Sequence, residues 1–341
     1  PPLYPAEAFS YMHIMEDEPL LLQKLNARLN QIEQDYRARM AFWKQNISRY
    51  GFMAETEWAS FGEEVERRND QFWSDMRNKI IPAFQRNDLA AIDTLRAGGN
   101  AADAAVVASA VLCVVEPAMT GVGGDCFALV GTPDGKVSGL NASGRAALAA
   151  DAGWLKASGL TEIALRSIHA ITVPGAIDGW DQLLKKFGTM DLAEALKPAI
   201  RLAEEGVPVT PRVAADWPED TPFLEADEGG RVHCLKDGRT PQVGETMRYP
   251  ALAQSMRLMA KEGRDAFYRG SLAEDIIATV RAKGSLLTMD DFAAHESTWV
   301  KPISTSFMGH EVLEIPPSGQ GLTALIAMNI VSQIGLKRHA P

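Results

Sequence analysis

The sequence predicts a layered α/β fold, α+β in its arrangement, with an extra helical segment at its N-terminus. Before residue 85, apolar residues recur every three or four positions, which is typical of amphipathic helices. From about residue 88, helical segments that end at glycines alternate with short apolar strands. We therefore expect two domains, a helical hairpin or appendage over residues 1–85 and a main domain over residues 86–341.

The N-terminal segment carries two apolar stripes at helical spacing. One runs from Leu22 to Met40 and the other from Trp58 to Ile80, and Gly51 between them allows a turn. A pair of helices of this kind can be a sensory or partner-binding module. Aromatic residues and methionines at helical spacing more often pack in a core, so we favour packing and keep the binding module as the alternative.

The main domain is expected to begin with two helices. Residues 87–97 predict a helix that ends at Gly98, and residues 101–115 predict an alanine-rich helix that ends before Pro117. Short apolar runs predict a buried strand over 126–130 and a strand over 137–148 that leads into a loop. Further along the chain we expect helices at 173–188, 191–206, 249–263 and 270–284, a capped short helix at 288–295, a strand at 311–315 and a buried helix at 322–335.

Composition excludes several classes of protein. The net charge of −10 argues against nucleic acid or an anionic membrane as the main partner. No apolar run reaches the ~18–20 residues of a membrane span, and the first residues lack a signal-peptide pattern, so we expect a cytoplasmic protein, or a periplasmic one if a signal was removed. Cys113, Cys126 and Cys234 form no metal-binding motif and fit structural thiols in a reducing compartment.

Gly121, Gly123 and Gly124 form a glycine-rich loop. A phosphate-binding loop follows a strand and opens a helix, so that free N–H groups at the helix start face the phosphate. Here the predicted order is helix, glycines, strand, and the spacing matches neither dinucleotide nor P-loop motifs. We infer instead that bare backbone passes close to a packed helix or a bound substrate.

Several segments together resemble one known family. "GGNAADAAVVASAVLCVVEPAMTGVGGDCFALV", "ITVPGAIDGWDQLLKKFGTMDLAEALKPAIRLAEEGVPVT", "GRDAFYRGSLAEDI", "GSLLTMDDFAAHE" and "EIPPSGQG" occur in the order seen in the large subunit of gamma-glutamyltranspeptidases. The resemblance covers residues 90–335 and leaves out the N-terminal helices. It implies an N-terminal-nucleophile hydrolase fold, an αββα sandwich.

The resemblance also implies a reaction and a partner. Such enzymes are precursors that cleave themselves before a threonine, which then attacks an amide with its own α-amino group as base. No metal or organic cofactor takes part. The family's nucleophile lies downstream of the proline-glycine motif, whereas Thr298 and Thr305 precede Pro316. We therefore expect a large-subunit portion, inactive alone and with no catalytic residue of its own, which forms a heterodimer with a small-subunit segment that carries the threonine.

Two departures bear on the substrate. Glutamyl-specific members of the family have an arginine that binds the substrate carboxylate. When the family motif is aligned with this sequence without gaps, that arginine falls on Ser143, two positions before Arg145. The motif at Ser318 has a glycine and Gln320 where a serine pair is commoner. Both changes resemble the branch with oxamate amidohydrolase and acylase-like members. The expected substrate-binding residues are Arg145, Asn141, Ser143, Ser318 and Gln320, with backbone near the pocket at Gly121, Gly123, Gly124, Gly319 and Gly321.

Each of these residues also has a structural interpretation. Arg145 can instead be an ordinary surface or structural arginine. Serines and amide side chains in loops often stabilise turns rather than bind a substrate. Two functions remain open. One is the large-subunit portion of a self-processing amidohydrolase or acyltransferase that acts on a small carboxylated amide, gamma-glutamyl or oxamate-like. The other is a non-catalytic binding protein that uses the N-terminal helices and keeps the α/β part as a scaffold.

Overall fold

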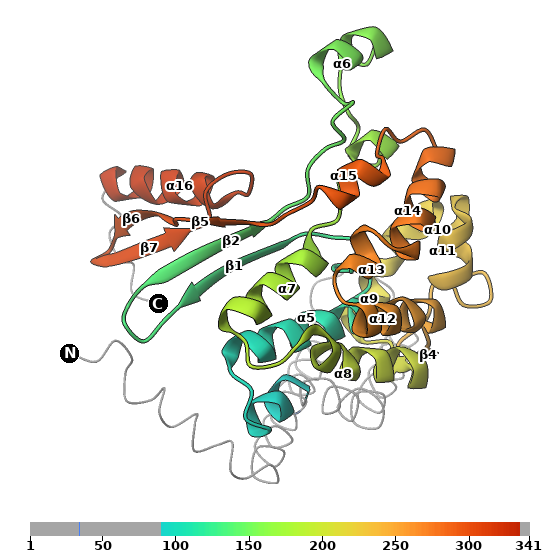
Figure 1. Ribbon diagram of the computed structural model, residues 1–341, viewed down its shortest axis with the longest axis horizontal. Coiled ribbons are helices and arrows are strands. Elements are labelled where there is room, and N and C mark those ends of the chain that lie inside the picture. Colours follow the sequence, from blue (N-terminus) through green and yellow to red (C-terminus); the bar gives the residue numbers. More distant parts are fainter. Residues whose placement is uncertain (1–33, 35–89, 335–341) are drawn as a thin grey trace, which may run out of the picture. The chain divides into compact units, whose positions relative to one another are not determined.

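A computed structural model of the protein describes residue 34 and residues 90–334 (Figure 1). The predicted appendage, with both its apolar stripes, lies outside the described residues apart from Gln34. Within the described residues, no helix is both long enough and apolar enough to cross a lipid bilayer.

Helices make up most of the described chain and strands the smaller part. A helical segment over 90–96 comes first. The labelled helices are α5 (Ala101–Val115), α6 (Ala152–Ser158), η4 (Ile168–Ala170), α7 (Ala176–Phe187), α8 (Leu192–Glu205), α9 (Pro211–Asp216), η5 (Trp217–Asp220), α10 (Thr221–Ala226), α11 (Glu228–His233), α12 (Pro250–Glu262), α13 (Asp265–Tyr268), α14 (Ser271–Ala282), α15 (Met289–Ala293) and α16 (Gly321–Ile334). The strands are β1 (Cys126–Gly131), β2 (Val137–Ala142), β3 (Val207–Pro208), β4 (Thr246–Met247), β5 (Thr298–Val300), β6 (Ile303–Phe307) and β7 (His310–Glu314).

The central sheet brings distant parts of the chain together. β2 lies between β1 and β5 and is antiparallel to both, and its register sets Asn141 opposite Thr298. α7 lies against β1 and β2 (Figure 1). A Cβ on Gly179 would lie 2.7 Å from the Cβ of Ala142, so this helix can reach the sheet only because residue 179 is glycine. β6 and β7 form a separate hairpin on which α16 packs.

Most predicted elements are confirmed, and two differ in burial. The order of helix, glycines and strand from α5 to β1 is as expected. The strand over 126–130 was expected to be buried, but Phe127 and Leu129 are 41% and 40% exposed, because α7 covers only the other face of β1. The helix over 322–335 was also expected to be buried. Leu325 is buried against the β6–β7 hairpin, whereas Ile326 and Ile330 on the opposite face are exposed.

The hydrophobic core lies among α5, α7, α8 and α12. Alanines on α5 allow it to pack closely on α8. Asp103, fully buried in the first turn of α5, accepts hydrogen bonds from the N–H of Asn100 (2.8 Å), the N–H of Met190 (3.1 Å) and the hydroxyl of Thr189 (2.8 Å). This carboxylate therefore caps α5 and fixes the connection between α7 and α8.

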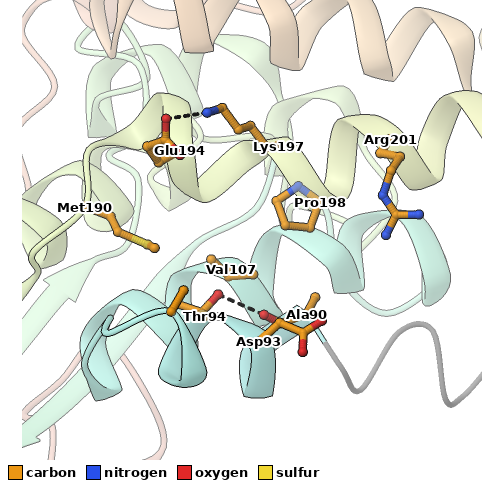
Figure 2. Close-up of a pocket in the computed structure, with 10 residues that line it drawn as sticks. Ala90, Asp93, Thr94, Val107, Met190, Glu194, Lys197, Pro198 and Arg201 are labelled. Carbon is orange, nitrogen blue, oxygen red and sulfur yellow. Dashed lines mark hydrogen bonds and ion pairs between the residues drawn. The ribbon is translucent and has the colours of Figure 1, made fainter.

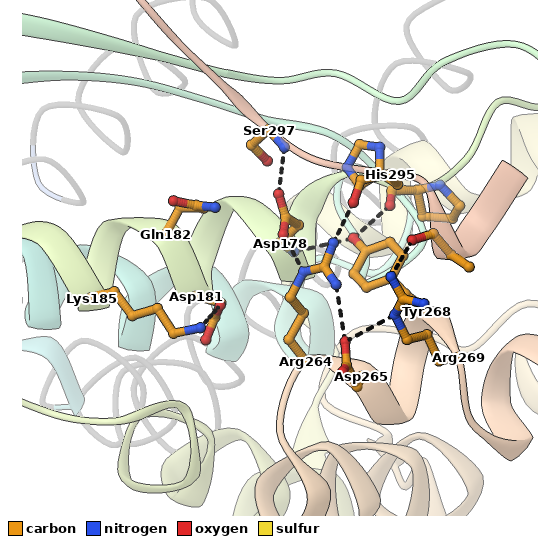
Figure 3. A network of polar contacts seen from close by, with 12 residues as sticks. Asp178, Asp181, Gln182, Lys185, Arg264, Asp265, Tyr268, Arg269, His295 and Ser297 are labelled. Carbon is orange, nitrogen blue, oxygen red and sulfur yellow. Dashed lines mark hydrogen bonds and ion pairs between the residues drawn. The ribbon is translucent and has the colours of Figure 1, made fainter.

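A second buried carboxylate, that of Asp178, joins three segments. In Figure 3, Arg264 lies between Asp178 on α7 and the more exposed Asp265. The side chain of Asp178 is 1% exposed, and its carboxylate also accepts the N–H of Ser297 (2.6 Å). Arg264 also donates to the carbonyl oxygen of His295. The ion pair therefore ties the segment that leads into β5 to α7.

Replacing Asp103 with Asn should lower the free energy of unfolding by about 3 kcal/mol at neutral pH, since an amide leaves buried donors without an acceptor. Burial raises the pKa of Asp103, but hydrogen bonds from Asn100, Thr189 and Met190 outweigh it and hold the pKa below 3.8. The contribution of the ionised Asp103 to the free energy of unfolding is therefore complete above pH 3.8. It is lost as the pH falls through the pKa of Asp103 in the folded state. Urea unfolding at neutral and acid pH measures both effects, and the exposed Asp93→Asn should change stability by less than about 0.5 kcal/mol.

Replacing Asp178 with Asn should cost about 3 kcal/mol of unfolding free energy, because Arg264 is then left without its buried partner. Asp265→Asn removes the other carboxylate from the same arginine. Because Asp265 is 64% exposed, its loss should cost less than about 1 kcal/mol. Thermal and urea unfolding of the two variants provide the comparison, and equal losses would contradict a special role for the buried pair.

Candidate active site

The chain that leaves β2 passes very close to the chain that enters α7. An ideal Cβ on Gly144 would lie 1.4 Å from the carbonyl oxygen of Val173, and one on Gly175 would lie 1.8 Å from that of Ala142. Neither position has room for a side chain. The N–H of Val173 donates to the carbonyl of Arg145 (3.0 Å), so the backbone that carries Arg145 is held in place.

The glycine-rich loop lies against the first turn of α7. The carbonyl oxygen of Gly124 accepts hydrogen bonds from the N–H groups of Gly175 and Ala176, both at 2.9 Å. The N–H groups at this helix start therefore bind a carbonyl of the chain itself. A Cβ on Gly123 would meet no atom within 4 Å, so the loop borders open space on that side.

A pocket of about 220 Å³ lies beside the end of β2. The turn before α16 and the segment that enters β5 complete its wall. Its lining residues are Asn141, Ser143, Gly144, Arg145, Glu296, Thr298, Pro317 and Ser318. Asn141 and Thr298 meet there because they are register partners in the sheet. The side-chain oxygen of Asn141 accepts the N–H of Ser143 (2.9 Å), which shapes the loop toward Arg145.

Four of the five predicted substrate-binding residues line this one pocket: Asn141, Ser143, Arg145 and Ser318. Gln320 does not line it. Its side-chain oxygen accepts the hydroxyl of Thr323 (3.2 Å) at the start of α16. Gly319 borders open space, whereas a Cβ on Gly321 would lie 2.7 Å from the carbonyl of Ile315, so Gly321 serves close packing.

Glu296 and Thr298 line the pocket but were not predicted from the sequence. They follow α15, which the sequence predicts as a capped short helix and which belongs to a segment that carries the family resemblance, but neither signal marks a pocket. The pairing of β2 with β5 places them beside Asn141, and that pairing joins residues more than 150 positions apart. His295 to Thr298 alternate between buried and exposed in the structure, but all four residues are polar, so the sequence carried no local signal of this alternation.

Arg145 and Glu296 carry the fixed charges of the pocket. Both are exposed, and neither forms an ion pair within the described part of the chain. His295 is 3% exposed and stacks on Tyr268 with ring centroids 5.2 Å apart. Burial lowers the pKa of His295; Asp178 opposes this shift, and the positive charges of Arg264 and Arg145 add to it. His295 is therefore neutral at neutral pH.

The thiols of the chain are not placed for chemistry. Cys113, Cys126 and Cys234 are free, and burial raises the pKa of Cys113 to about 12 and that of Cys126 to about 11. Neither is a thiolate at neutral pH, and thiolates are the reactive form. This agrees with the structural role predicted for these cysteines.

Two larger pockets have less suitable chemistry. One of about 340 Å³ lies between the helical segment 90–96 and α8 (Figure 2). Its charged side chains pair with neighbours, Lys197 with Glu194 and Arg201 with Glu205. The other, of about 400 Å³, is lined mainly by residues 165–171 and by Lys283, which pairs with Asp227. The smaller pocket at Arg145 has the unpaired charges and converging polar groups of a binding site.

The arrangement at Arg145 can bind a ligand but does not contain a complete reaction centre. A guanidinium with nearby hydroxyl and amide groups suits a carboxylate. In the described part of the chain, no pocket hydroxyl is hydrogen-bonded to a histidine that could act as its base. Nor do three or more His, Cys, Asp or Glu residues there gather as metal ligands would.

Comparison with known proteins gives the family. A family model described as gamma-glutamyltranspeptidase matches residues 88–341. The glutathione hydrolase-like YwrD proenzyme of Bacillus subtilis (strain 168) is 40% identical over 69% of this chain and 45% of its own length. The oxamate amidohydrolase proenzyme of Klebsiella pneumoniae is 34% identical over 72% of this chain and 47% of its own length.

A solved structure agrees with this assignment. The cephalosporin acylase from Bacillus halodurans superimposes with a TM-score of 0.69 at 41% identity, covering 74% of this chain and 48% of the acylase. The chain thus spans about half the length of the curated relatives it matches. The predicted fold class is confirmed, and so is the similarity to oxamate amidohydrolase and acylases. The chain belongs to the gamma-glutamyltranspeptidase family.

Proposed function

We propose that this chain is the large-subunit portion of a self-processing enzyme that hydrolyses a small carboxylated amide or transfers its acyl group. A small-subunit segment outside this chain supplies the N-terminal threonine, and the two parts form a heterodimer. Support comes from the family and from relatives named as a glutathione hydrolase-like proenzyme, an oxamate amidohydrolase proenzyme and a cephalosporin acylase.

One observation carries the proposal: Arg145 lies in the same pocket as Asn141, Ser143 and Ser318. These residues come from two segments more than 170 positions apart in the sequence. A guanidinium forms two parallel hydrogen bonds with a carboxylate, and the hydroxyl and amide groups beside it provide further partners. The pocket therefore suits the carboxylate end of an acyl group.

In the proposed mechanism this chain binds and orients the substrate. Arg145 holds the acyl carboxylate, so that the amide carbon points toward the threonine of the small-subunit segment. The threonine hydroxyl loses its proton to its own α-amino group and attacks that carbon. The resulting oxyanion is held by backbone N–H groups until the amine leaves and an acyl-enzyme forms. Water or an amine then takes the acyl group and frees the threonine.

Self-processing is tested by expressing the chain together with the segment that follows it in the gene. Mass spectrometry should find a new N-terminal threonine, and hydrolysis of gamma-glutamyl and oxamate-type amides should appear with it. Replacing that threonine with Ala should abolish both. If no chain break forms and no amide is hydrolysed, the enzyme proposal is wrong and the binding-protein alternative gains support.

Replacing Arg145 with Ala in the assembled enzyme should lower kcat/KM for a carboxylated amide by roughly 10- to 100-fold, mainly through KM, because a charge-assisted hydrogen bond to the substrate is lost. Arg145→Lys should recover part of the loss, since an ammonium keeps the charge but not the paired geometry. Steady-state kinetics measure both variants. Arg212→Ala, which removes an exposed arginine from α9, serves as the control and should leave kcat/KM unchanged.

A further inference from the structure

His295 is a buried titratable residue that the proposed mechanism does not use. Its side chain is 3% exposed, and its ring stacks on Tyr268 with the ring centroids 5.2 Å apart (Figure 3). Neither ring nitrogen has a hydrogen-bond partner among the described residues. The site therefore suits a flat, uncharged ring, because an imidazolium has two N–H donors and a charge that all need partners.

The charges around His295 disfavour a further positive charge. Arg264, which precedes α13, lies over the ring of Tyr268 and donates to the carbonyl oxygen of His295. Burial lowers the pKa of His295, and the carboxylate of Asp178 on α7 opposes this shift. Arg264 and Arg145, the arginine after β2, add to it. Tyr268 on α13 stays neutral, because burial raises the pKa of its hydroxyl.

The two nearby carboxylates already have partners. Asp178 binds the guanidinium of Arg264 through one oxygen and the N–H of Ser297 through the other (2.6 Å). Asp291 on α15 accepts the N–H of Leu148 (3.0 Å) through one oxygen and caps its own helix with the other. A proton on the histidine would therefore add an unpaired charge to a buried site, where it is far less favourable than in water.

The segment that carries this histidine also carries part of the pocket wall. Residues 295–298 alternate between buried and exposed, and the exposed Glu296 and Thr298 line the pocket. The carbonyl of His295 and the N–H of Ser297 bind the buried ion pair. Both bonds come from backbone within two residues of the imidazole, so the ring cannot move into water without disturbing them.

We propose that His295 is an acid-sensitive latch, whose neutral ring holds residues 295–298 in place and whose protonation releases them. Release moves Glu296 and Thr298 out of the pocket wall, so the pocket is complete in neutral solution and is lost in mild acid. The latch itself concerns the fold, whereas its effect on catalysis rests on the proposed function.

The direction of the pH dependence follows from burial. In the released segment the histidine regains its ordinary pKa of 6.5, whereas the pKa in the folded state is lower. The neutral ring therefore holds the segment fully above pH 6.5. Below pH 6.5 the released population grows by about 10-fold per pH unit, until the pH reaches the pKa of the folded state. Asp178 does not titrate in this range, because its hydrogen bonds hold its pKa below 3.8.

Hydrogen exchange of backbone amides in the assembled protein measures the release. After correction for the pH dependence of chemical exchange, protection of residues 297–300 should fall by about 10-fold between about pH 7.5 and about pH 5.5. Dilute urea should leave this exchange unchanged, because local release exposes little surface, while it accelerates exchange in the core helix α8.

Variants show whether His295 is the titrating group. His295→Phe keeps a ring to stack on Tyr268 but cannot take up a proton, so the loss of protection in acid should shrink to about 2-fold or less. His295→Gln, which is polar and equally unable to become charged, should give the same result. His310→Gln, at an exposed histidine on β7, should keep the full loss.

The outcomes separate the latch from the proposed function. The latch is wrong if the wild-type protein keeps its protection in mild acid, if either His295 variant loses it as the wild type does, or if urea accelerates exchange of residues 297–300 as much as that of α8. Hydrolysis of gamma-glutamyl and oxamate-type amides is measured in parallel at neutral pH. If the exchange follows the expected pattern but no amide is hydrolysed, the proposed enzyme activity fails while the latch stands.

Discussion

The ion pair between Asp178 and Arg264 is the interaction on which the rest of the site depends. The side chain of Asp178 is almost entirely out of water and that of Arg264 is 17% exposed, so the buried carboxylate needs the charge of the arginine. Asp178 belongs to α7, Arg264 precedes α13, and through Ser297 and His295 the pair also holds the segment that enters β5. Burial raises the pKa of Asp178, but hydrogen bonds from Ser297 and Arg264 outweigh it, so the carboxylate stays ionised down to pH values below its usual range.

Close backbone packing is the second constraint on the pocket. Gly144 and Gly175 let the chain after β2 and the chain before α7 approach to distances that no side chain allows. This contact positions Arg145. The glycine-rich loop contributes differently, because the carbonyl of Gly124 accepts the free N–H groups at the start of α7. Two neighbouring sets of glycines thus serve separate purposes, one in packing and the other in capping a helix.

In the proposed enzyme, the groups that line the pocket explain why substrate binding and bond cleavage belong to different segments. The pocket offers a cation, a carboxylate and several hydrogen-bonding groups, but no hydroxyl with a base beside it in the described part of the chain. We propose that such a set recognises a charged acyl group while another segment cleaves the bond. The chain covers about half the length of its curated relatives.

Local patterns in the sequence determined the helix ends, because glycine and capping residues act within a few positions, as at Gly98 and Thr288. They also indicated the family and four of the residues that line the pocket. Burial of β1 and α16 could not be predicted, since an apolar run does not show which faces are covered. Glu296 and Thr298 were likewise missed, because only the pairing of β5 with β2 brings them to Asn141. That pairing is decided by the tertiary structure, through buried contacts between segments far apart in the chain.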